Sequence, residues 1–280
     1  MKLVLYLIIG FFVFLTGQTM GEHVAINREI EAFKKKGVFQ ESISTDTVKY
    51  YKVSRETYYP NEIVRDPFFL GDLSRPGSSG DIFVTQQSPL VGYAGIHQFV
   101  SFFFGGHAAM LDENNKIFET VGIPDDDERL LDVMINGGRN THVVGGVYNY
   151  WLDNDYRSVS ETDPSYVAYG TYYRNEWIGL RVKGATNDDI VGALDYLRDL
   201  EEKEAQYNFW FVLNTKNKYY CTDLVSRAYE SLRTDEGDQK YKFNRDGIAV
   251  TVNDLVLSKN TYISYYVTTK NNIKYVYYIA

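Results

Sequence analysis

Cysteine is almost absent from this chain of 280 residues, which has a single one, Cys221. One cysteine cannot form an internal disulfide, so the fold must be stable without a disulfide framework, even in an oxidising compartment. Histidine is also scarce, with four residues, and no HExxH motif occurs, so we expect no metal site. Phosphate-binding glycine motifs and a GxSxG elbow are missing as well. We therefore expect no cofactor and no serine-hydrolase elbow.

Positive charge is in deficit, because the formal net charge is −8 and the pI is near 5.1. A chain of this sign repels phosphate backbones, so nucleic acid is not an expected partner. Tyrosine is abundant instead, with 25 residues. Many of them fall in short β-like runs such as 262–266, which favours sheet surface and core over a carbohydrate-stacking platform.

The first residues have the pattern of a secretory signal. Lys2 is followed by an apolar run over 3–15 and then by small and polar residues. We expect a signal peptide over 1–21 with cleavage before Glu22. Cleavage after Gly17 and an uncleaved anchor are the alternatives. The run is shorter than the ~20 apolar residues that span a bilayer, so we expect a secreted or cell-envelope protein with no stable membrane span after cleavage.

The rest of the chain is long enough for one α+β domain. We expect an N-terminal extension over 22–71 and a main domain over 72–280. In the extension, the spacing predicts a helix over 25–36 and a strand plus loop over 45–70. The main domain is expected to contain strands near 80–86, 107–111, 116–121, 141–151, 166–173 and 176–183, helices over 124–135, 187–203 and from 221, and a hairpin over 261–279 that turns at Asn271-Asn272.

Cys221 has two interpretations. Apolar residues at 224, 225, 228 and 232 place it on the apolar stripe of a helix, where a lone cysteine is often a small buried hydrophobe. It also lies in the first turn, where unpaired amides and the helix dipole stabilise a thiolate and can hold an oxyanion. The residues alone leave both interpretations open.

A thiol nucleophile needs a base, and His107 is the best candidate. Two glycines precede it, so backbone can approach closely, and a strand follows. The next strand carries Glu119, an acid among apolar residues, which could fix the tautomer and tilt of an imidazole. The other histidines are expected in less suitable places, namely a disordered N-terminus (His23), a loop (His97) and the start of a strand (His142).

For Glu119 to orient His107, both side chains must lie on one face of the hairpin. A four-residue loop over 112–115 would point Glu119 to the wrong side. A three-residue loop over 112–114 pairs Leu111 with Asn115 and sets His107 directly opposite Glu119. We predict this register or a bulge equivalent to it.

The motifs GDIFVT, GGHAAML, IFETVG, YNFWF and YYCTDLVSRAY, in this order, resemble the permuted branch of the NlpC-type, papain-like cysteine hydrolases (YiiX/YaeF-type). The resemblance covers about 72–257. It implies a permuted papain-like fold, with an antiparallel sheet packed against the cysteine-bearing helix. Transferred by position, it implies Cys221 as nucleophile, His107 as base, Glu119 as its orienting residue and Tyr207 near the oxyanion. Two departures are a threonine at 222, where serine is commoner, and the segment 252–255, which lacks a proline.

These features predict a thiol hydrolase that cleaves an amide bond through an acyl-enzyme on Cys221. The expected substrate is a cell-wall peptide, because the wider superfamily cuts such peptides and an exported protein would meet them. A peptide, a peptidoglycan fragment or a lipid acyl group could serve as the partner. The alternatives are a lipid-directed acyl hydrolase or acyltransferase, and a non-catalytic secreted binding module.

Overall fold

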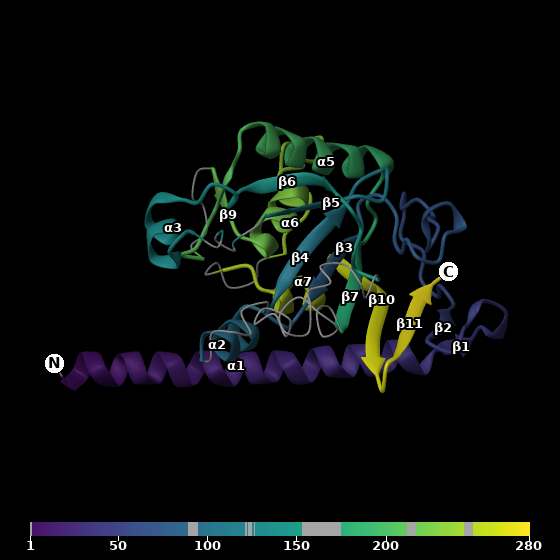
Figure 1. Cartoon of the computed structure of the whole chain (residues 1–280), viewed down its shortest axis with the longest axis horizontal. Coiled ribbons are helices and arrows are strands. Elements are labelled where there is room, and N and C mark those ends of the chain that lie inside the picture. The colour runs from purple at the N-terminus through teal and green to yellow at the C-terminus, as the bar shows by residue number, and fades with distance from the viewer. Residues whose placement is uncertain are drawn as a thin grey trace.

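The computed structural model describes residues 2–88, 95–120, 122, 125, 127–152, 175–211, 217–243 and 249–280, and all structural statements concern these residues. The strand predicted near 166–173 lies outside them. The described chain is an α+β fold with one large sheet and helices packed on it (Figure 1).

The sheet has nine strands in the order β1-β2-β11-β10-β7-β3-β4-β5-β6. Within the described residues, β2 and β11 pair in parallel and every other neighbouring pair is antiparallel. The strands are β1 (Gly37–Phe39), β2 (Val48–Val53), β3 (Ile82–Thr85), β4 (His107–Leu111), β5 (Ile117–Thr120), β6 (Val143–Val147), β7 (Glu176–Val182), β10 (Thr261–Lys270) and β11 (Ile273–Ile279). A separate two-stranded ladder joins β8 (Gln206–Tyr207) to β9 (Lys218–Tyr219).

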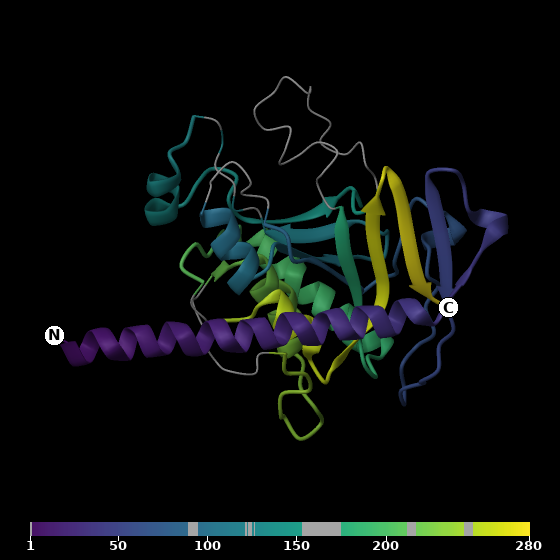
Figure 2. The same cartoon turned by 90° about the horizontal axis from the view of Figure 1, so that it is seen from below.

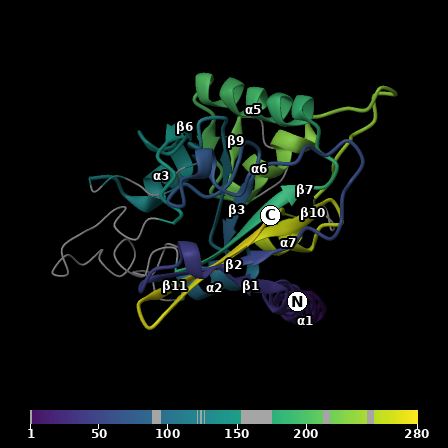
Figure 3. The same ribbon diagram turned by 90° about the vertical axis from the view of Figure 1, so that its right-hand side faces the viewer.

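Helices α1, α5, α6 and α7 pack on one face of this sheet. A core cluster joins their apolar side chains to alternate residues of β3, β4 and β7. The second cluster, on the other face, contains loop residues such as Phe68 and Trp151. The helices are α1 (Lys2–Lys35), α2 (Ile96–Phe103), α3 (Leu130–Asn136), α5 (Asn187–Glu202), α6 (Cys221–Glu230) and α7 (Val252–Leu257), with 3-10 turns η1 (Glu41–Ile43) and η2 (Phe69–Gly71). Figure 3 looks along α1 and shows α1 and α5 at opposite margins of the molecule.

Two predicted elements follow directly from local chemistry. Helix α5 begins at a capping box, in which the Thr186 hydroxyl accepts from the Asp189 amide and the Asp189 carboxylate accepts from the Thr186 amide. The hairpin β10–β11 turns at Asn271 and Asn272, which have φ of 51° and 60°. Asparagine tolerates this left-handed conformation, so both predictions are confirmed. The helix predicted over 124–135 is shorter, because α3 begins only at Leu130.

Helix α1 is longer than predicted. The helix expected over 25–36 is the last part of a continuous helix that begins at Lys2, and its N-terminal end extends beyond the body of the molecule (Figure 2). The side chains of Ile26 and Ile30 are buried in the core cluster and attach the C-terminal part of α1 to the sheet. His23, which we expected to be disordered, lies in this helix and contacts the Phe102 carbonyl at 3.0 Å. No helix in the described part of the chain is long and apolar enough to cross a membrane.

The extension 22–71 belongs to the same sheet as the main domain. Strand β2 pairs in parallel with β11, from Val48 opposite Lys274 to Val53 opposite Ile279. Strand β1 then pairs with β2 at the edge of the sheet. Strands β1 and β2 of the extension therefore form one edge of the sheet of the main domain.

A buried charge cluster ties the extension to the sheet. Asp81, from the GDI motif, is fully buried and accepts from the guanidinium of Arg181, with Nε–Oδ1 at 3.0 Å and Nη2–Oδ2 at 3.1 Å. Arg65 forms a second ion pair with Asp81 at 2.9 Å. Arg181 also donates to the carbonyls of Arg65 and Asp66. Burial disfavours the charged guanidinium, but Asp81 outweighs it and raises the pKa of Arg181.

We predict that Asp81→Asn lowers the free energy of unfolding by about 3–5 kcal/mol, because it leaves two buried guanidinium groups without their carboxylate. Urea denaturation followed by circular dichroism measures this loss. Asp195→Asn is the matched control, because Asp195 forms an exposed pair with Arg198 and such pairs contribute little. Equal stabilities of the two variants would contradict the role given to Asp81.

Candidate active site

The His107–Glu119 pair predicted from the sequence is present. His107 opens β4 and Glu119 lies in β5, and their Nε2 and Oε2 atoms are 2.6 Å apart. Both side chains are largely buried, with 12% and 4% exposed. The hydroxyl of Tyr150 donates to the same Oε2 at 2.7 Å. Because a carboxylate only accepts, His107 donates through Nε2, and Nδ1 is left as the basic ring nitrogen.

The backbone before His107 needs both glycines. A Cβ atom on Gly106 would lie 1.9 Å from the carbonyl oxygen of Gln87, so a side chain there would displace backbone. Gly105 has φ of 84°, in the left-handed region. The close backbone approach expected from the GGH sequence is confirmed.

The predicted hairpin register is wrong in detail. Leu111 pairs with Ile117, not with Asn115, so Glu119 lies across from Ala109 rather than from His107. The Asp112 amide donates to the Lys116 carbonyl, so the three-residue loop is 113–115 instead of 112–114, and Asn115, with φ of 58°, is its left-handed residue. Moving the loop by one residue moves the partner of each β4 residue by two positions along β5. A shift of two positions preserves the face of a strand, so Glu119 still reaches His107 along the diagonal.

Two residues that contact the His107–Glu119 pair, Tyr150 and Trp151, were not predicted from the sequence. Trp151 stacks on the imidazole of His107, with ring centroids 6.1 Å apart and planes 12° apart. Its segment is fixed by buried amides, because Asn149 donates to Asn115 and to the Pro76 carbonyl. The Asn-Tyr-Trp run at 149–151 was a visible signal, but nothing in it indicated contact with a strand some thirty residues earlier.

Cys221 is the first residue of α6, as predicted, and is 8% exposed. The preceding Tyr220 forms no side-chain cap, so the first-turn amides of α6 are not capped by it. Leu224, Val225 and Ala228 are buried as predicted, but α6 ends at Glu230 and Leu232 lies beyond it, half-buried. Cys221 therefore combines a core position with the start of a helix, and both interpretations of this thiol keep their physical basis.

The two faces of β4 meet different clusters. Ala108 lies in the cluster that contains Cys221, and Ala109 lies in the cluster that contains Trp151. Since alternate residues of a strand face opposite sides, His107 shares the face of Ala109 and Trp151. Helix α6 packs against β4 and β5 from the other face. The thiol and the imidazole can therefore meet only around the end of β4, where His107 stands.

Several contacts bring the start of α6 to that end of β4. The Val250 amide donates to the Tyr220 hydroxyl at 2.7 Å. The Thr222 hydroxyl donates to the Val250 carbonyl at 2.6 Å. Two residues later, the Val252 amide donates to the Phe104 carbonyl at 3.0 Å. Phe104 is three residues before His107, so one short chain of bonds links the neighbours of the two candidate catalytic groups.

Tyr207 forms a second link. Its ring lies against the backbone of Gly122, where a Cβ atom would be 2.6 Å from the ring, and Gly122 follows Glu119 closely in the chain. Strand pairing sets Tyr207 beside Tyr219, just before Cys221. Burial of the hydroxyl and the nearby Cys221 raise the pKa of Tyr207 well above its usual range, although part of the residue is exposed. Tyr207 is therefore a neutral hydrogen-bond donor near the thiol.

The remaining polar candidates have local roles. His97 lies in α2 rather than in the loop we predicted, and His142 forms a bridge with Gln206. The segment 252–255 begins α7, where Thr251 and Asp254 form a capping box in place of a proline. Among the described residues, no cluster of three or more histidine, cysteine or acidic side chains could hold a metal ion.

Comparisons with protein-family models, with curated proteins and with solved structures find no match for this chain.

We predict that Cys221 Sγ lies within ~3–4 Å of a His107 ring nitrogen, at the end of β4. A crystal structure of the full chain measures this distance. A shorter distance from Cys221 to His97 or His142 would show that the base assignment is wrong. If no imidazole lies near the sulfur, the catalytic interpretation loses its main support.

Asp223, in the first turn of α6, supplies a prediction on pH. Burial raises its pKa to about 6, from an ordinary value of 3.8, although the ion pair with Arg227 at 2.8 Å acts in the opposite direction. The folded protein therefore holds this proton more tightly than the unfolded chain between about pH 4 and 6. The stabilising effect of that proton is present at low pH and is lost as the pH rises through 6.

We therefore expect the stability of wild type relative to Asp223→Asn to fall by up to about 3 kcal/mol between pH 4 and pH 7. Urea denaturation of both proteins across this range measures the difference. Parallel stability profiles would show that the carboxyl group titrates alike in both states.

Proposed function

We propose that the protein is a thiol hydrolase with a permuted papain-like arrangement, in which Cys221 attacks a carbonyl and His107 is the base. The observation that carries the proposal is the His107–Glu119–Tyr150 chain, which leaves Nδ1 of an imidazole as the basic atom. The order of the motifs along the sequence supports the same assignment. A core histidine without a catalytic task has little need for a buried carboxylate that is itself held by a tyrosine.

The reaction follows acyl transfer in two steps. His107 takes the proton of the Cys221 thiol, and the thiolate adds to the carbonyl carbon of the substrate. The amine leaves with the proton from His107, and a thioester remains on Cys221. His107 then takes a proton from water, whose oxygen attacks the thioester, and the products are a carboxylic acid and the free thiol.

The oxyanion of each tetrahedral intermediate would lie at the start of α6. The first-turn amides and the dipole of this ten-residue helix favour negative charge there. Tyr207 lies beside Tyr219, two residues before Cys221, and its neutral hydroxyl would be an additional donor. Glu119 stays ionised and takes up no proton in this scheme, because its task is to accept from Nε2–H and hold the ring in place.

An amide bond in a cell-wall peptide is the proposed target, and the secreted or envelope location follows from the apolar N-terminal run. One observation favours the lipid-directed alternative. An aromatic series leads from exposed Phe99 through Phe104 and Phe211 to Tyr220, beside Cys221, with ring centroids 6.1, 4.8 and 5.2 Å apart. Such a series would accept an acyl chain. Peptidoglycan fragments assayed beside acyl-glycerols distinguish these two substrates.

We predict that Cys221→Ala and His107→Ala each abolish turnover while the fold persists. Cys221→Ala removes one small group, so the free energy of unfolding should fall by only about 1 kcal/mol. Activity assays and thermal melts on the same preparations test this. His142→Ala is the matched control and should keep wild-type activity.

Alkylation separates the enzyme from a binding module. A catalytic Cys221 should react with iodoacetamide near neutral pH, and more slowly in His107→Ala, whereas a buried structural thiol stays inert. Wild-type turnover in Cys221→Ala would end the proposal.

A further inference from the structure

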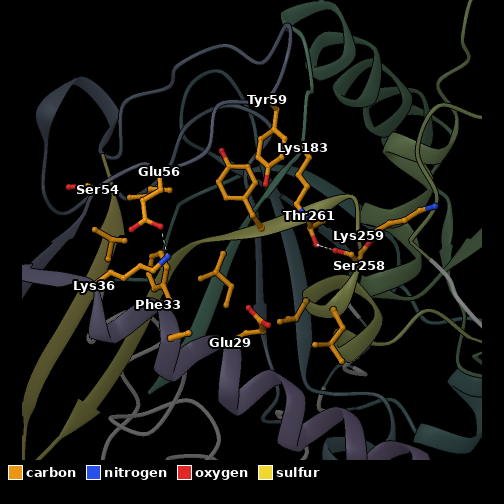
Figure 4. A pocket seen from close by; sticks show the side chains of 17 residues that line it. Glu29, Phe33, Lys36, Ser54, Glu56, Tyr59, Lys183, Ser258, Lys259 and Thr261 are labelled. Carbon is orange, nitrogen blue, oxygen red and sulfur yellow. Dashed lines mark hydrogen bonds and ion pairs between the residues drawn. The ribbon is translucent and has the colours of Figure 1, made fainter.

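A cavity of about 430 Å³ lies on the helix side of the sheet, where the extension meets the main domain. Its walls come from the C-terminal turns of α1, the loop after β2, the end of β7, the turn after α7 and the start of β10 (Figure 4). Its volume lies within the range of roughly 300–1,000 Å³ that is typical of small-molecule pockets, and it is open to solvent on one side. This is the size of a small organic ligand rather than of a few waters.

The wall loop after β2 is fixed by buried polar contacts. Glu62 pairs with Arg55 at 3.3 Å, and both side chains are almost fully buried. The Tyr262 hydroxyl donates to Glu62, and the Gly184 amide donates to its other oxygen at 3.0 Å. The loop is therefore attached to both β7 and β10, and the cavity does not depend on a ligand for its shape.

Part of the interior is apolar, and the rest is polar. Phe33 of α1 and Ile263 of β10 pack against the core cluster, and the rings of Tyr59 and Tyr262 stack with centroids 5.5 Å apart. An aliphatic side chain of a ligand would lose water by entering here. This accounts for the body of a ligand, and the charges on the rim decide its ends.

Charges of opposite sign line opposite walls. Lys36 and Glu56 pair with each other at 2.6 Å and so neutralise each other. Lys183, from the end of β7, lies in the upper wall beside Tyr59, while Glu29 of α1 lies in the lower wall (Figure 4). Neither Lys183 nor Glu29 has an ion-pair partner among the described residues. Glu29 and Lys259 are both exposed, but the side chain of Lys259 points away from the cavity (Figure 4).

We propose that this cavity binds a short zwitterionic peptide, with its α-carboxylate at Lys183, its α-amine at Glu29 and an aliphatic side chain against Phe33 and Ile263. A dipeptide with one leucine has about fourteen non-hydrogen atoms, a small ligand that a cavity of this size admits. A purely anionic ligand would meet Glu29, and a purely cationic one would meet Lys183. The site is separate from Cys221 and does not depend on catalysis there.

Calorimetric titration of the full chain tests the site with three probes, which are leucylalanine, N-acetyl-leucylalanine and leucylalanine amide. We expect leucylalanine to bind with one-to-one stoichiometry, and each blocked probe to bind about tenfold more weakly, since each loses one charge-assisted contact. Lys183→Met should weaken leucylalanine about tenfold and remove the difference between it and its amide. Glu29→Gln should do the same for the acetylated probe. Cys221→Ala should bind leucylalanine like wild type.

Two pairs of variants exclude indirect effects. Ala32→Trp, at an exposed position of α1 on the rim, should block binding, whereas Asn27→Trp, exposed on the same helix outside the cavity, should not. Lys52→Met changes the net charge as Lys183→Met does, at an exposed site away from the cavity, and should bind normally. The proposal is overturned if leucylalanine does not saturate the protein. It is equally overturned if the blocked probes bind as tightly as leucylalanine, or if Ala32→Trp binds normally.

Discussion

The buried carboxylate of Asp81 is the interaction on which the rest of the structure depends. It lies between the guanidinium groups of Arg181 and Arg65, and its charge is what makes their burial tolerable. Asp81 precedes β3, Arg65 belongs to the extension, and Arg181 belongs to β7, a hundred residues after Asp81, so the cluster fixes three segments at one point. Strand β3 then pairs with β4, whose first residue is His107. The placement of the candidate base therefore depends on a salt bridge that takes no part in the chemistry.

Local chemistry made much of the fold predictable. The capping box of α5, the asparagine turn of the C-terminal hairpin and the helix that begins at Cys221 each depend on residues within a few positions of one another. The position of residues 22–71 could not be read in the same way. Strand β2 pairs with β11, more than two hundred residues later, and its alternation of side chains does not identify a partner. The strand order of the sheet is likewise a property of long-range packing.

In the candidate site, too, only the features that depend on local sequence were predictable. Glu119 was recognisable because an acid in an otherwise apolar strand needs a partner, and His107 was the nearest suitable one. The exact register was not recognisable, because a strand pairing that shifts by two positions keeps every side chain on the same face of the sheet. Tyr150 and Trp151 were missed because their contacts cross from a loop to the sheet. The relation of Cys221 to His107 depends on how α6 approaches the end of β4, which periodicity does not encode.

The parallel pair β2–β11 has a consequence for how the chain reaches its folded state. Pairing between residues near 48 and residues near 276 is among the most distant contacts that this sequence can make. During synthesis, β2 can pair with β1, but the two strands cannot join the rest of the sheet until β11 has been made. A chain of this topology completes its core late, and until then the apolar face of the sheet stays exposed. It also makes the final strand, which is far from the candidate active site, necessary for closing the fold.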